Sequence, residues 1–169
     1  MTPREITLKL AANQDIFKRL LSGKTGSEYL WRPEPGKWNL LEIVCHLLDE
    51  EREDFRDRVK HTLENSLAAM KPINPVGWVL ERNYASQDYE KTLRSFLSER
   101  SDSVAWLQTL THANWENAHR HPKLGTLSAR LFLVNWLAHD YLHIRQIIRY
   151  NYQFLQEQTG MDLQYAGTW

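Results

Sequence analysis

Apolar residues recur at helical spacing in four separate segments of this chain, and this periodicity restricts its fold more than any other feature. The first segment follows Thr2-Pro3-Arg4-Glu5, a capping box with proline at the first helical position, and Gly23 ends it. The second follows Asn39, which can cap the helix while Glu42 reaches back to the cap. We expect this second helix to extend to about His61 or a little past it.

Two further helices are expected in the second half of the chain. One begins near Ser86 and ends near Leu110, and its apolar stripe also contains Arg100. The other begins after Gly125-Thr126, where Thr126 can cap it, and continues to Tyr150 or beyond.

The connections between these helices are rich in proline and glycine. Residues 29–37 and 71–77 therefore read as loops, and no segment shows the pattern of a strand hairpin. Four long amphipathic helices predict an all-α fold, with residues 1–169 forming a single four-helix-bundle domain. Because two of the connections are long, an up-down-up-down order of the helices does not follow from the sequence.

Charge and cysteine content exclude several function classes. The 21 basic and 21 acidic residues cancel, which argues against a nucleic-acid or anionic membrane partner. The mixed charges of residues 49–54 are typical of a solvated helix face. The single cysteine, Cys45, excludes an internal disulfide and is better read as a small buried residue than as a catalytic thiol. With no signal-peptide pattern and no apolar run long enough to cross a bilayer, we expect a cytoplasmic protein.

Two histidines lie within one of the most apolar stretches of the chain. His139 and His143 are four residues apart, so on a helix they share one face and can bind one divalent ion. Taken alone, the pair is better explained by core packing with ordinary hydrogen bonds. His46 changes this balance because it also lies in an apolar stripe, on a different helix. Three imidazoles from facing helices would leave one coordination position open, which suits catalytic zinc; nickel, cobalt and iron also accept imidazole.

Residues 36–51, GKWNLLEIVCHLLDEE, and 133–147, LVNWLAHDYLHIRQI, together resemble the DinB/YfiT-like superfamily. The resemblance extends over nearly the whole chain. It implies a four-helix bundle that is often dimeric, with a divalent metal ion held by three histidines; here these would be His46, His139 and His143. Zinc or nickel is favoured, with iron, cobalt and manganese as alternatives. Asp140 matches a commonly acidic position and would orient an imidazole.

The resemblance also implies two different functions. Some relatives are thiol-dependent S-transferases or isomerases that use a low-molecular-weight thiol such as bacillithiol or mycothiol, and a metal ion can equally support hydrolysis of a small molecule. In either reaction Glu50 or Asp49 could accept a proton, Glu50 being the stronger candidate. The alternative is a non-catalytic metal-binding or interaction protein in which the ion stabilises the bundle.

Other histidines and aromatic residues are weaker candidates. His112, His119 and His121 precede the last helix, where they either line the mouth of a pocket or are solvated. His61 has no evident partner. Trp136 lies one turn before His139 and is the tryptophan expected nearest the site.

Overall fold

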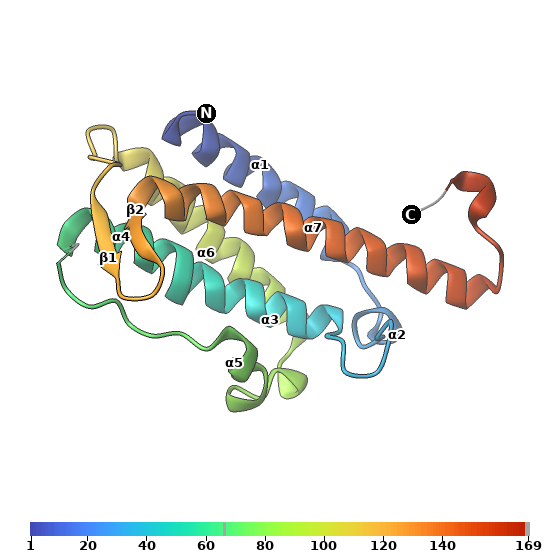
Figure 1. The fold of residues 1–169 in the computed structure, drawn as a ribbon. Coiled ribbons are helices and arrows are strands. Elements are labelled where there is room, and N and C mark those ends of the chain that lie inside the picture. The colour runs from blue at the N-terminus through green and yellow to red at the C-terminus, as the bar shows by residue number, and fades with distance from the viewer. Residues whose placement is uncertain (66, 168–169) are drawn as a thin grey trace.

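Four long helical segments, which we call the arms of the bundle, make up most of the protein and confirm the predicted four-helix bundle (Figure 1). The computed structural model describes residues 1–65 and 67–167. The first arm is α1 (Pro3–Leu21), the third is α6 (Tyr89–Thr109) and the fourth is α7 (Ala129–Thr159). The second is a continuous helix composed of α3 (Leu40–Glu50), a π-helical turn η1 (Glu51–Phe55) and α4 (Arg56–Asn65).

Both predicted capping boxes are present. At the start of α1, the Thr2 backbone N–H donates to Glu5 Oε2 over 2.6 Å, and the Glu5 N–H donates to Thr2 Oγ1 over 3.2 Å. At the start of α3, the Asn39 and Glu42 side chains accept each other's backbone N–H groups, both over 2.9 Å. These bonds satisfy backbone donors that have no partner within the helix, so each arm starts at a defined residue.

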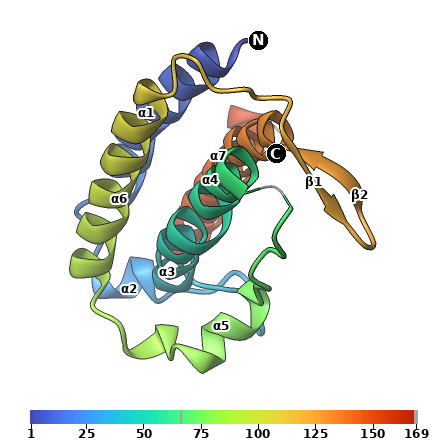
Figure 2. The same ribbon diagram turned by 90° about the vertical axis from the view of Figure 1, so that its left-hand side faces the viewer.

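The arms do not follow one another around the bundle. Helix α1 packs against α6 and α7, α3 packs against α6, and α4 packs against α7 (Figure 2). The first and second arms therefore lie across the bundle from each other, although they are consecutive in sequence. The long connection between these two arms makes this arrangement feasible.

A small antiparallel hairpin precedes α7, so the expectation that the chain has no strand hairpin was wrong. Strand β1 (Ala118–His121) pairs with β2 (Gly125–Ser128), and Gly125 occupies the left-handed region with φ +79°. The hairpin also corrects the predicted start of α7. Thr126 lies in β2, where it pairs with Arg120, so the helix starts only after the strand. Ser128 caps the helix by accepting a hydrogen bond from the Leu131 N–H over 3.1 Å.

Several short helices lie outside the four arms. They are α2 (Gly26–Tyr29), α5 (Pro75–Glu81), η2 (Tyr84–Ser86) and η3 (Gln164–Ala166). Helix α5 overlaps the predicted loop 71–77, because Asn74 caps it and Pro75 takes the first helical position. Within the described residues, no helix is both long and apolar enough to cross a membrane.

A polar layer divides the apolar core into two clusters. On α1, one cluster contains Phe17 and Leu21 and the other contains Ile6 and Leu10. Asn13, a buried polar residue of α1, lies between them in sequence. In each of the other three arms, buried polar residues also lie between members of the two clusters in sequence, among them Glu51, Arg100 and Asp140.

Candidate metal centre

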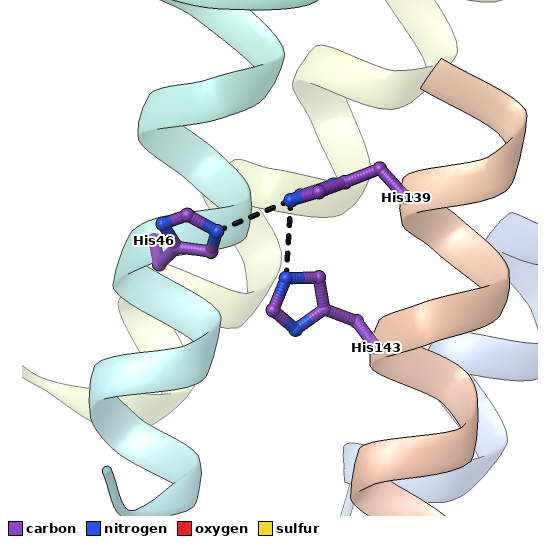
Figure 3. Close-up of side chains that lie close together, drawn as sticks. All are labelled: His46, His139 and His143. Carbon is purple, nitrogen blue, oxygen red and sulfur yellow. Dashed lines mark hydrogen bonds between the residues drawn. The ribbon is translucent and has the colours of Figure 1, made fainter. Parts of the chain in front are cut away.

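The imidazoles of His46, His139 and His143 converge on one point between α3 and α7 (Figure 3). The Nε2 atom of His139 lies 3.2 Å from Nε2 of His46 and 3.1 Å from Nε2 of His143. One potential ligand atom from each ring lies within 4.8 Å of the others. Helix geometry places the two α7 rings one turn apart on one face, and the packing of the bundle brings α3 against them. The histidines predicted from the sequence are therefore brought together.

The donor atoms suit a divalent metal ion. Two nitrogens bound to one tetrahedral zinc ion at 2.0–2.1 Å are about 3.3 Å apart, close to the separations observed here. The Gln146 Oε1 atom lies 2.9 Å from His143 Nδ1, and a carbonyl oxygen only accepts, so Nδ1 carries the proton. The Nε2 of His143 then presents a lone pair to the other two rings. Lone pairs that face one another repel unless a proton or a cation lies between them.

Burial keeps the three rings neutral. Burial, and after it repulsion from the neighbouring His143, lowers the pKa of His46 to about 3 and that of His139 to about 2. Burial also lowers the pKa of His143, against the effect of its Gln146 hydrogen bond. The neutral imidazole is the form that binds metal ions. The buried Nδ1 of His46 has no hydrogen-bond partner among the described residues, so this ring is not fully satisfied by the protein alone.

Aromatic rings enclose the cluster. The Trp38 ring lies 5.0 Å from the His46 ring, and the Phe55 ring lies 4.9 Å from the His139 ring. Trp136 stacks on Phe55, with 6.0 Å between ring centroids. The expectation that Trp136 is the tryptophan nearest the site was therefore wrong, because Trp38 packs directly on a histidine of the cluster.

A buried ionic network adjoins the histidines. Arg100 donates to both Glu51 oxygens over 2.8–3.0 Å and to both Asp140 oxygens over 2.7 and 2.8 Å. Asn13 donates to Asp140 over 3.0 Å, and the Trp136 indole donates to Glu51 over 3.0 Å. All four arms thus contribute to one network. One of its members, Asp140, directly follows His139 in the sequence.

This network corrects two interpretations of the sequence. The Asp140 carboxylate bonds to Arg100 and Asn13 instead of orienting an imidazole. Residues 49–54 are not simply a solvated face, because Glu50 and Glu51 are 4% and 1% exposed. Sequence reasoning missed this network, although the position of Arg100 in an apolar stripe was a signal that it is buried.

The two candidate proton acceptors have different surroundings. Asp49 accepts a hydrogen bond from the Tyr84 hydroxyl over 2.6 Å and forms an ion pair with Arg82 over 2.9 Å. Glu50 is buried, and its Oε1 atom has no partner among the described residues. Burial, followed by a hydrogen bond with Asp54, raises the pKa of Glu50 to about 8. Glu50 is thus the carboxyl group that can exchange a proton near neutral pH.

The remaining histidines and the cysteine lie outside the cluster. His112 is exposed, whereas His119 is buried. His61 has partners, contrary to expectation: its Nε2 lies 2.9 Å from the Ala68 carbonyl oxygen and its ring packs on that of His119. Cys45 is buried, and burial raises the pKa of its thiol to about 12, which agrees with a packing residue.

Two cavities are each lined by a histidine of the cluster. The first, which we call the His143 cavity, has a volume of about 610 Å³. The second, the His139 cavity, has a volume of about 450 Å³ and includes His121 in its wall. Leu142 lines both. Asp54, which contributes to the raised pKa of Glu50, lines the His139 cavity.

Comparisons with known proteins agree with this description. The sequence profile of the DinB superfamily matches residues 9–147. The fold is similar to that of YfiT from Bacillus subtilis, described as a probable metal-dependent hydrolase with an unusual four-helix bundle topology. The TM-score is 0.78 at 19% sequence identity, and the match covers 95% of this chain and 89% of that one. The sequence has no significant match among curated proteins.

Proposed function

The chain belongs to the DinB superfamily, and from this premise we propose that it is a metal-dependent enzyme acting on a small molecule. In this proposal His46, His139 and His143 hold one divalent ion, with zinc or nickel favoured over iron, cobalt or manganese. The observation that carries the proposal is the convergence of three neutral imidazoles, with Nε2 separations of 3.1 and 3.2 Å. The description of YfiT as a probable metal-dependent hydrolase supports it.

The reaction class we favour is transfer of a low-molecular-weight thiol to an electrophile, with hydrolysis as the alternative. A divalent ion bound by imidazoles would act as a Lewis acid that lowers the pKa of a thiol or water. In the transfer, sulfur bonds to an electrophilic carbon, the leaving group departs with the bonding electron pair, and the thiol proton goes to a base. Cavities of 450 and 610 Å³ are of the size that small-molecule ligands occupy.

We assign the proton transfer to Glu50. A pKa of about 8 makes both protonation states accessible near neutral pH, as a general acid–base group requires. Asp54, which contributes to the raised pKa of Glu50, lines the His139 cavity, and in this proposal the proton passes between Glu50 and the cavity through Asp54. Glu50→Gln should therefore lower turnover and remove one limb of the pH–rate profile while leaving metal content unchanged.

Metal content tests the premise of the proposal. Protein purified without an affinity tag should contain about one divalent ion per chain by mass spectrometry, and His139→Ala should reduce this to near zero. His112→Ala is the matched control, because His112 is exposed and lies outside the cluster. A metal content near zero in the unmodified protein, with no change in thermal stability in His139→Ala, would refute the metal centre.

Activity separates an enzyme from a protein with a structural ion. Metal-loaded protein should consume low-molecular-weight thiols in the presence of electrophiles, or hydrolyse small substrates, and His143→Ala should lose this activity with its circular dichroism spectrum unchanged. The non-catalytic alternative predicts inactivity throughout such a panel. It also predicts a large drop in melting temperature on metal removal, since an ion at about a thousand times its Kd stabilises a fold by about 4 kcal/mol.

A further inference from the structure

The two cavities at the histidine cluster differ in charge. The His139 cavity is walled mainly by apolar side chains, and its Arg58 is already paired with Asp54 of the same cavity. The His143 cavity contains Lys37, Arg145 and Arg149, with Glu34 as its one acidic residue. The approach to the cluster from the His143 side is therefore the cationic one.

These three cations have no ionic partner among the described residues. None of the ion pairs found in the described parts of the chain involves Lys37, Arg145 or Arg149. Arg145 and Arg149 are four residues apart on α7, a spacing at which like charges repel and destabilise a helix. Lys37 approaches from the segment before α3, so two distant parts of the chain contribute cations to one cavity. An anion in the cavity would relieve this repulsion.

A polar chain connects this cavity to the cluster. His143 Nδ1 donates to Gln146, and the Gln146 amide lies 3.5 Å from the Tyr150 hydroxyl. All three side chains line the cavity together with the cations. A ligand that occupies the cavity would therefore contact both a proposed metal ligand, His143, and the guanidinium groups. Guanidinium groups bind carboxylate and phosphate through paired hydrogen bonds.

We propose that the His143 cavity binds the anionic group, carboxylate or phosphate, of a small-molecule substrate or co-substrate through Lys37, Arg145 and Arg149. This inference rests on the proposed function for the role of the ligand, but the binding itself does not require the metal. A cavity of about 610 Å³ accepts a small molecule, and its three cations favour a ligand with more than one negative charge. The apolar remainder of the ligand would lie along Leu142, which both cavities share.

Calorimetric titration of metal-free protein at low ionic strength tests the proposal. The probes are succinate, inorganic phosphate and, as a neutral analogue of succinate, succinamide. We expect at least one anion to bind and succinamide not to bind; the anion that binds more tightly identifies the group. The double variant Arg145→Gln/Arg149→Gln should weaken binding at least about tenfold, because each lost charge-assisted hydrogen bond has a cost of that order.

Two further variants test whether anion binding depends on the residues that line the His143 cavity. Lys37→Gln should also weaken anion binding, and it tests the site from a segment outside α7. Arg130→Gln is the matched control, because Arg130 is an exposed arginine of α7 that does not line the cavity. This variant should bind the anion with the same affinity as the unmodified protein.

Anion binding by the His143 cavity and metal-dependent activity are tested by different measurements, so either can fail without the other. If neither anion binds, or if the double variant binds as tightly as the unmodified protein, the anion site is refuted whatever the metal content. If the anion binds but purified protein contains no metal, the anion site is supported and the metal-dependent function is refuted.

Discussion

Replacing Arg100 by methionine should remove a large part of the stability of this protein. The Arg100 side chain is 1% exposed, and its two carboxylate partners, Glu51 and Asp140, are 1% and 0% exposed. The substitution retains most of the apolar volume but leaves two buried carboxylates without their cation. Breaking a buried ion pair by removing one partner costs about 3–5 kcal/mol. A typical domain has a total stability of about 5–15 kcal/mol, so the variant should be folded but much less stable.

Urea denaturation followed by circular dichroism measures this loss. With an m-value of about 2 kcal/mol/M, the midpoint should fall by about 1.5–2.5 M while the slope stays constant. Arg94→Met is the matched control, because Arg94 is exposed on the same helix, and its midpoint should not change. Arg100→Lys should lie between these variants, since it restores the charge but not the planar donor geometry.

A small effect would refute this reasoning. If Arg100→Met lowers the free energy of unfolding by less than about 1 kcal/mol at constant slope, the carboxylates find other partners or water, and the network is not the buried layer described above.

Three further predictions concern the cap of α7, Glu50 and Cys45. Ser128→Ala should lower the free energy of unfolding by about 1 kcal/mol, because it leaves the Leu131 N–H without its acceptor, whereas Thr126→Ala should change little; urea midpoints decide this. The pKa of Glu50 is raised from 4.5 to about 8, because burial favours the protonated carboxyl group. In metal-free protein, the stabilisation that this shift provides is complete below pH 4.5 and is lost as the pH rises through about 8. Glu50→Gln should therefore lose less stability than the unmodified protein between pH 5 and pH 8.5, and an equal loss would contradict the raised pKa. Cys45 should resist thiol reagents in the folded protein and react on unfolding; rapid labelling of folded protein would show that the thiol is not buried.

Local features of the sequence were sufficient to predict the four long helices and the members of the cluster. Capping boxes at Thr2 and Asn39 act within four residues, so their outcome does not depend on the rest of the fold. The spacing of His139 and His143 places them on one face of any helix that contains both. The start of α7 was misplaced, because Thr126 and Ser128 are both good caps and only the pairing of β2 selects between them. The homodimer implied by the resemblance stays a prediction.

The sequence by itself determined that four amphipathic helices form and that three histidines lie on their apolar faces, since both properties depend on residues a few positions apart. Only the tertiary structure decided which helices are neighbours, and hence that His46 Nε2 lies 3.2 Å from His139 Nε2 on α7. It also decided that Arg100 neutralises two buried carboxylates from different helices. Contacts between arms depend on how the helices pack against one another across the bundle, and the periodicity of a single helix carries no information on which helix it faces.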